Sequence, residues 1–354
     1  MAGALGSYAF LNAKLKTRLS QLLPQETITG LIRAKSLPEA FLLLRGTRFE
    51  GLEASYNATG DLRAGEALLY AADASVFAEL RRLVKGPIAA FFEALSLRFE
   101  IDNLKQVLRL WFDGRFRGGD SIGQSAYLDR QPIVHAIDID ALLAATDAAA
   151  VATALKGTPY AAIIAVGLAE AIERGNLFKL ELALDRRYFD GALAAAAKLS
   201  KADRTIAERA LRMDADASNA DRLIRFKTCY NLDAAEALDY LIPYGSASRA
   251  RGLGEAYSGD HTAGLMVQAL GGQLGRLSSF IAAAGDGKAS LGLLVKALRQ
   301  LALDEAWRLL GGYPFSIAIP LAYASLRHED IRVALAILNA KYYGLAEERI
   351  RDAL

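Results

Sequence analysis

The chain has 354 residues, of which 53% are hydrophobic, and its 42 lysines and arginines nearly balance its 40 aspartates and glutamates. This length suffices for two or three domains, and a formal net charge of +2 excludes both the strongly basic surface of a general nucleic-acid binder and an acidic solvating tail. The single cysteine excludes an internal disulfide and a cysteine-based zinc site, so we expect a reducing, intracellular compartment.

Neither the N-terminal segment nor the longest uncharged run predicts membrane insertion. The first ten residues, MAGALGSYAF, lack the positively charged start of a secretory signal, so we expect a protein that is not exported. The uncharged run covers residues 309–326 but contains two glycines and two prolines, which break a lipid-exposed helix. We therefore predict no transmembrane segment.

Helical periodicity dominates the chain, and patterns typical of strands are nearly absent. Ser36 and Pro38 mark the first turn of one helix. The clearest apolar face has spacings of three and four and consists of Ile101, Leu104, Leu108 and Trp111. We expect Lys105, Gln106 and Arg109 to point away from that face.

Two further helices are predicted downstream. High alanine content favours a helix over residues 141–155. A C-terminal helix is predicted to end at Gly344, and its apolar face consists of Ile331, Leu335, Leu338 and Tyr342. The fold class is therefore all-α.

A short string occurs three times in the chain, as LRGTRF at 44–49, LKGTPY at 155–160 and LGGYPF at 310–315. We interpret each copy as a helix end that is stopped by glycine before an aromatic residue. A second string recurs along with the first, as DNL at 102–104, SNA at 218–220 and, with weaker similarity, EDI at 329–331.

The spacing of these strings indicates duplication of a whole helical domain. In three pairs of matching residues the second member follows the first by about 110 residues, far more than the period of solenoid repeats. The pairs are Leu44 with Leu155, Asn103 with Asn219, and Asp73 with Asp185. Each of the two aspartates has a phenylalanine four positions later. In the third copy the two strings lie closer together, so a helical insert is missing or displaced there.

Sequence motifs for catalysis are incomplete. The segment 285–290, GDGKAS, lacks the first glycine and the hydroxyl residue of a phosphate-binding loop, so we interpret it as a plain turn. The glycines at 252 and 254 follow no strand, as a dinucleotide site would require. We interpret Cys229 as a small core residue of a helix.

An all-helical chain of this length also fits a magnesium-dependent prenyl-transferring enzyme, which needs clustered aspartates on facing helices. The nearest candidates are Glu181 with Asp185 and Asp214 with Asp216, and neither forms a DDxxD cluster. We expect these acids to be solvated or salt-bridged, with Arg186 and Arg187 as surface partners of Asp185. The histidines lack the spacing of a zinc helix, so we expect surface or capping roles for His135, His261 and His328. We predict no catalytic residue, cofactor or metal, and the enzyme stays open as the alternative.

Polar residues accompany the second string in every copy, with acids before bases. The candidates for binding a partner are Asn103, Lys105 and Arg109 in the first copy, Asn219, Arg222 and Arg225 in the second, and Glu329 and Arg332 in the third. One interpretation is that they are capped, solvated helix starts. The other is that three equivalent helix starts converge on a docking surface.

The sequence resembles a known family, the C subunit of the archaeal and bacterial V-type (A-type) ATP synthases, which is equivalent to the d subunit of the vacuolar proton pump. The similar segments are YAFLNAK at 8–14, FEIDNLK at 99–105, LDRRYF at 184–189 and DASN at 216–219. The most specific signature is C-terminal, with YPF at 313–315, LAY at 321–323, HEDIR at 328–332 and KYYGL at 341–345. Here His328 stands where the family usually has lysine, and Asp221 where it has a base.

The resemblance implies an all-helical funnel of three similar domains with pseudo-threefold symmetry. The expected domains are 1–125, which includes an N-terminal helix that packs on the third domain, 126–245 and 246–354. It further implies a non-catalytic rotor subunit on the cytoplasmic face of the membrane. In that role the chain joins the central shaft, subunits D and F, to the proteolipid ring, for ion-driven ATP synthesis or ATP-driven ion pumping.

Overall fold

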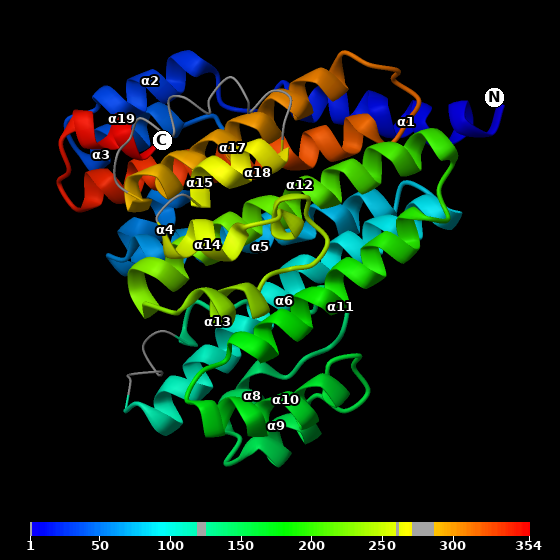
Figure 1. Cartoon of the computed structure of the whole chain (residues 1–354). Coiled ribbons are helices and arrows are strands. Elements are labelled where there is room, and N and C mark those ends of the chain that lie inside the picture. The colour runs from blue at the N-terminus through cyan, green and yellow to red at the C-terminus, as the bar shows by residue number, and fades with distance from the viewer. Residues whose placement is uncertain (1, 119–124, 260–261, 271–286) are drawn as a thin grey trace. The chain divides into compact units, whose positions relative to one another are not determined.

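The computed structural model describes residues 2–118, 125–259, 262–270 and 287–354. Every regular element within these ranges is a helix, which confirms the predicted all-α class (Figure 1). The chain divides into two compact units. We call Met1–Ile139 with Gly312–Leu354 the terminal unit, and Asp140–Gly311 the central unit.

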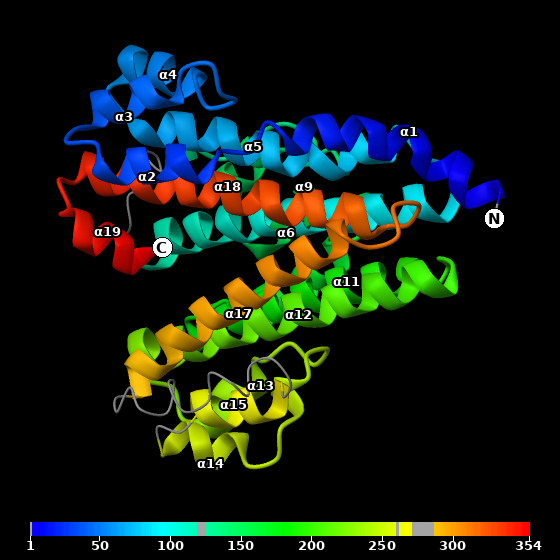
Figure 2. The ribbon, with the colours of Figure 1, turned by 90° about the horizontal axis from the view of Figure 1, so that it is seen from above.

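The terminal unit combines helices from both ends of the chain. Its helices are α1 (Ala2–Leu19), α2 (Gln25–Arg33), α3 (Leu37–Leu44), α4 (Gly51–Thr59), α5 (Leu62–Arg81), α6 (Gly86–Phe116), α18 (Ala318–Tyr342) and α19 (Glu347–Ala353). The long helix α18 packs against α1, α2, α3, α5 and α19, and Figure 2 shows it running beside α1 and α5. N-terminal residues such as Leu31 and Phe41 therefore share one core with Leu335 and Leu338.

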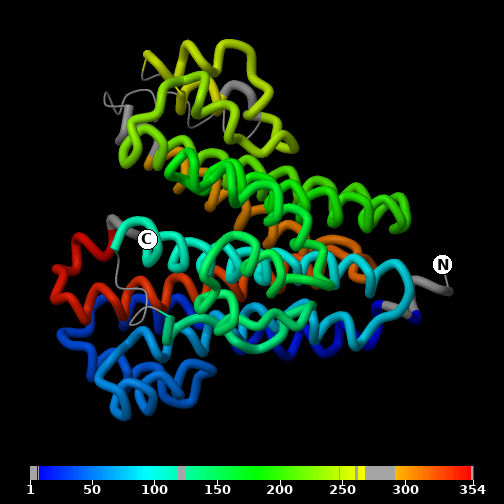
Figure 3. Tube along the Cα trace, turned by 90° about the horizontal axis from the view of Figure 1, so that it is seen from below, coloured from blue at the N-terminus to red at the C-terminus, as the bar shows by residue number. Residues whose placement is uncertain are grey.

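The central unit is a continuous stretch of chain, traced from green to orange in Figure 3. Its helices are α8 (Ile139–Ala144), α9 (Ala148–Ala154), α10 (Ala161–Arg174), α11 (Phe178–Ala196), α12 (Lys201–Arg225), α13 (Ala234–Asp239), α14 (Leu253–Ser258), α15 (Thr262–Leu270) and α17 (Gly287–Leu310). Two short turns complete it, the π-helical η1 (Phe226–Tyr230) and the 3-10 helix η2 (Ala247–Arg249). Phe226, Tyr240 and Met266 lie in its core.

Most of the expected helix faces are confirmed. Ile101, Leu104, Leu108 and Trp111 are all buried on α6. The expectation for Lys105 is wrong, because its stem is buried and its ammonium pairs with Asp102 at 2.8 Å. The predicted face of α18 is buried except at Tyr342, where the helix ends two residues before Gly344, whose φ is +67°.

Local capping residues set two of the helix starts. Ser36 accepts a hydrogen bond from the Glu39 amide and begins α3, as predicted. The single helix expected over 141–155 is instead two helices, α8 and α9. Asp147 separates them because its carboxylate caps α9 by accepting the Ala150 amide at 2.8 Å. Capping therefore outweighs alanine propensity at this position.

The first repeated string folds into the same turn in its first two copies. The carbonyl of Leu44 accepts the hydroxyl of Thr47 at 2.6 Å, and the carbonyl of Leu155 accepts that of Thr158 at 2.7 Å. The intervening glycines both have positive φ, +73° at Gly46 and +90° at residue 157. These equivalent contacts support a duplication.

The third copy of that string has a different conformation. There α17 ends at Leu310, and Tyr313 replaces the threonine whose hydroxyl closes the turn in the first two copies. Phe315 is only half-buried, whereas Phe49 and Tyr160 at the corresponding positions are fully buried. The boundary between the two compact units also falls here, between Gly311 and Gly312. That boundary lies inside the third expected domain, 246–354, so the threefold division stays a prediction.

Candidate functional site

The polar residues of the second string lie in the middle of long helices. Asn103 is on α6, Asn219 is on α12, and Asp330 is on α18. The expectation that they mark helix starts is therefore wrong, because each helix begins at least one dozen residues earlier. Neither capping nor the helix dipole explains their polarity.

The two asparagines instead hold the segments that follow their helices. The Asn103 side-chain amide donates to the Asp129 carbonyl at 2.7 Å. Asn219 is fully buried, donates to the Ile242 carbonyl and accepts from the Ile242 amide, both at 2.8 Å. An asparagine side chain thus pairs with a peptide group in both copies.

The acid three residues before each asparagine makes the same kind of contact. Glu100 accepts the Val134 amide at 2.8 Å, and Asp216 accepts the Ser246 amide at 3.1 Å. Gly245 lies so close to Asp216 that an added Cβ would come within 2.2 Å of its Oδ1. The second copy therefore requires a residue without a side chain at this position.

In the third copy the corresponding backbone comes from the other end of the chain. Asp330 accepts the Leu23 amide at 3.1 Å, and its other oxygen lies 3.3 Å from Arg48 Nε. Burial raises the pKa of Asp330, and the nearby Arg48 cation opposes that rise. We call Asn103, Asn219 and Asp330, with the backbone groups they bind, the helix ties.

The remaining partner-binding candidates divide by burial. Arg222 is buried and pairs with the equally buried Asp185. Arg109 is half-buried, whereas Arg225 is exposed and lies 3.1 Å from Asp221. Glu329 and Arg332 form a bidentate pair with contacts of 2.6 and 2.7 Å. Asn219, Arg222 and Lys105 therefore contribute to the interior, and the others reach the surface of the described chain.

The acids considered for magnesium chemistry have structural partners. Asp185 is salt-bridged as expected, but its partner is Arg222 rather than Arg186 or Arg187. Asp216 is bound to the Ser246 amide. In the part of the chain that the structure describes, no cluster of three or more acids, histidines or cysteines is arranged to hold a metal ion.

The expectation for Cys229 is wrong, because the residue is exposed in the π-helical turn η1 instead of lying in a core. His135 is half-buried, and its ring Nδ1 lies 2.7 Å from the buried Glu100 carboxylate. His261 and the glycine-rich residues 285–286 lie outside the described residues.

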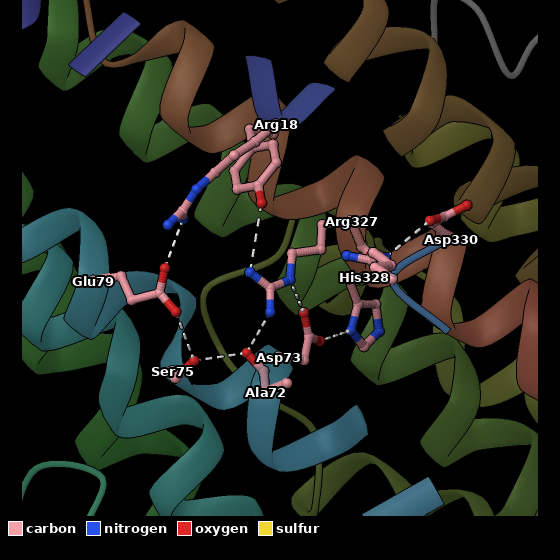
Figure 4. Close-up of polar contacts among 10 residues, drawn as sticks. Arg18, Ala72, Asp73, Ser75, Glu79, Arg327, His328 and Asp330 are labelled. Carbon is pink, nitrogen blue, oxygen red and sulfur yellow. Dashed lines mark hydrogen bonds and ion pairs between the residues drawn. The ribbon is translucent and has the colours of Figure 1, made fainter. Parts of the chain in front are cut away.

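Asp73 and Asp185, which share the repeat spacing, are both buried carboxylates that pair with a base on a neighbouring helix. Asp73 is on α5, and its partners are on α18 (Figure 4). His328 Nδ1 lies 2.7 Å from Asp73 Oδ2, and Arg327 Nε lies 3.9 Å from Oδ1. The repeat spacing of the aspartates could have predicted this burial, but no sequence signal identified the partners.

The helix α1 is attached to this region by polar contacts. Arg18 lies 2.6 Å from Glu79 on α5 (Figure 4). The side-chain amide of Asn12 donates to the Pro314 carbonyl just before α18. These contacts join helices and offer no nucleophile, so their chemistry is that of a structural clamp.

Aromatic side chains form a row at the C-terminal end of α18. The ring of Tyr56 lies 5.6 Å from Phe41 and 6.2 Å from Tyr342, which in turn lies 5.1 Å from Tyr343. Tyr343 is 71% exposed at the end of this row. Exposed tyrosines are common at protein interfaces, because they offer a large apolar area with a polar tip.

No helix among the described residues is both long enough and apolar enough to cross a lipid bilayer. The family described as "ATP synthase (C/AC39) subunit" matches residues 11–353. The A-type ATP synthase C subunit of Methanosphaera stadtmanae is 22% identical over 342 residues, which cover 94% of this chain and 84% of that protein. The C subunit of the Methanothermobacter thermautotrophicus A-type synthase is 21% identical over 352 residues, covering 98% and 87%. That of Desulfurococcus sp. is 24% identical over 348 residues, covering 98% and 90%.

Proposed function

Because the chain belongs to the ATP synthase (C/AC39) subunit family, we propose that it is a non-catalytic rotor subunit that joins the central shaft to the proteolipid ring of a V-type (A-type) complex. In this proposal the subunit is located at the cytoplasmic face of the membrane, and its partners in the shaft are subunits D and F. The observation that carries this proposal is the family match over residues 11–353, which includes both compact units.

A rotor subunit that transmits torque must resist deformation, and the helix ties supply that property. Each tie fixes the middle of a long helix to a backbone group distant in sequence, and a buried polar group that loses its partner is costly. Close helix packing adds stiffness, since protein interiors are as dense as organic crystals. Asn219 and Arg222 therefore support the docking surface from inside.

The proposal includes three similar domains, 1–125, 126–245 and 246–354, arranged as a funnel. Support comes from the order of the helices. The short helices α3 and α4 precede the long pair α5 and α6, as α9 and α10 precede α11 and α12. The short helices α13, α14 and α15 likewise precede the long helices α17 and α18.

The surface residues among the candidates provide the partner contacts in this proposal. Arg225, Glu329 and Arg332 are joined by Arg109 and the exposed Tyr343. Each exposed ionic contact contributes about 1 kcal/mol or less and is screened by salt. Single substitutions should therefore have little effect, and combined ones should release the subunit at high salt.

Co-purification from membranes tests the proposal. The wild-type chain should bring down the shaft and ring subunits. The combined variant Arg225→Gln, Glu329→Gln and Arg332→Gln should lose them as salt is raised. A matched control, Arg204→Gln, Glu208→Gln and Arg212→Gln, removes the same three charges from an exposed stretch of α12.

Three results would contradict the proposal. One is failure of the wild-type chain to recover either partner, and another is equal release of the test and control variants, which would refute the assigned surface. The third is release of diphosphate from prenyl substrates with magnesium, because that activity belongs to the alternative enzyme.

A further inference from the structure

Asp73 differs from the helix ties because a titratable group compensates its charge. Its side chain is 1% exposed, and its nearest cationic partner is His328 at 2.7 Å. The side chain of His328 is 57% exposed, so its ring exchanges protons with solvent directly. A solvent-accessible imidazole thus covers a buried carboxylate.

The permanent cation near Asp73 is poorly placed to replace the imidazole. Arg327 Nε is 3.9 Å from the carboxylate, and the Arg327 guanidinium donates to the Ala72 carbonyl at 2.6 Å (Figure 4). Arg48, from the segment before α4, faces Asp330 instead. The charge state of His328 therefore decides how well Asp73 is neutralised.

Titratable and charged groups also lie on the other elements that pack against α18. Glu329 on α18 and Arg98 on α6 interact electrostatically with His328. Asp330, two residues further along α18, faces Arg48, and the phenol of Tyr70 on α5 interacts with Asp73. The helix α1 carries the basic residues Lys14, Lys16 and Arg18, and Arg18 is paired with Glu79. The helix α2 meets α18 near Lys341, which donates to the Ile32 carbonyl, and α19 carries Glu347, which interacts electrostatically with that same lysine. The contact of α3 with α18 is apolar, through residues such as Phe41.

We propose that His328 and Asp73 form a pH-sensitive clasp between α18 and α5, which tightens when the imidazole is protonated and loosens when it is neutral. A neutral imidazole can still donate from Nδ1, but it leaves the buried carboxylate with only the Arg327 guanidinium, 3.9 Å away, as a cation. The loosening therefore comes from lost charge compensation rather than from loss of the contact itself.

The direction of the pH dependence follows from the pKa of His328. The hydrogen bond to Asp73 raises this pKa above its ordinary value of 6.5, and burial opposes the rise. A raised folded-state pKa stabilises the fold fully below the unfolded value. That stabilisation is lost as pH rises through the folded-state pKa, so the clasp loosens on the alkaline side of pH 6.5.

The clasp connects the two ends of the chain, since α5 ends at Arg81 and α18 begins only at Ala318. Loosening it would soften the terminal unit. The consequence for torque transmission rests on the proposed function, whereas the clasp itself does not.

Two NMR measurements on the full-length chain test the clasp. The first is a titration of the histidine rings from pH 5 to 9, with the His328 signal assigned by its loss in His328→Gln. We expect a His328 pKa above 6.5 that falls in Asp73→Asn. An unshifted pKa in the wild-type chain, or the same pKa in Asp73→Asn, would overturn the clasp.

The second measurement is amide hydrogen exchange of α5 and α18, corrected for the intrinsic pH dependence of exchange. Protection should fall by about three- to fivefold between pH 6 and 9 in the wild-type chain. His328→Lys should keep the low-pH protection throughout, and His328→Gln should show the weaker protection at both pH values. The control His135→Gln, which removes the other histidine–carboxylate pair, should retain the wild-type change. Equal pH dependence in all four proteins would refute the proposal, and co-purification with shaft and ring does not enter this result.

Discussion

The tie at Asn219 allows a quantitative test of how the long helices are held. In Asn219→Ala, the Ile242 amide and carbonyl would both lose partners at 2.8 Å in a fully buried site. Each buried group left without a bond costs about 1–3 kcal/mol, so we expect about 2–6 kcal/mol in total. The equivalent Asn103→Ala should cost about 1 kcal/mol, because Asn103 is only half-buried and makes a single such bond to Asp129.

Local hydrogen exchange, measured by mass spectrometry, suits a chain with two compact units, because a single unfolding midpoint would mix their contributions. Peptides covering 237–246 should exchange at least about thirtyfold faster in Asn219→Ala, and those covering 125–135 about fivefold faster in Asn103→Ala. If Asn219→Ala lost no more amide protection than Asn103→Ala, the reasoning from burial and the number of hydrogen bonds would be refuted.

Two further predictions concern the other ties. Arg48→Gln should destabilise the terminal unit by about 3 kcal/mol, measured as faster hydrogen exchange of peptides from that unit, because Asp330 then stays buried without its cation. Adding Asp330→Asn should recover part of the loss, and additive effects would show that the two residues do not interact. Gly245→Ala should destabilise the central unit by more than about 2 kcal/mol, since its Cβ would meet Asp216 at 2.2 Å. The matched Gly264→Ala, in the helix α15 with open space around it, should be neutral or slightly stabilising, and equal losses would argue against the close contact.

Periodicity and repeat spacing predicted the all-α class, the apolar face of α6 and the shared turn at Gly46 and residue 157. These features depend on local physics, in which a few neighbouring residues decide the conformation. The same reasoning misplaced Lys105 and Cys229, because the burial of a long or small side chain depends on which helix packs over it.

The site was less predictable than the fold. The repeat marked Asn103 and Asn219 as one pair of equivalent positions and Asp73 and Asp185 as another. Because these side chains are polar, sequence reasoning favoured solvated positions for them over buried ones. The partners are backbone groups or bases far away in sequence, such as Leu23 for Asp330, and no local pattern encodes them. Buried polar residues are hydrogen-bonded, so a polar residue that recurs on an apolar helix signals an interior contact as readily as a docking surface.

The contact between Leu23 and Asp330 links residues that the ribosome produces about 300 residues apart. The terminal unit therefore cannot be completed until nearly the whole chain has been synthesised. The central unit is contiguous, from Asp140 to Gly311, so its core can form while translation continues. During that interval the N-terminal part of the chain, up to Ile139, lacks its packing partner α18. The apolar faces that α18 later covers are then exposed, and these are the faces that chaperones would need to shield.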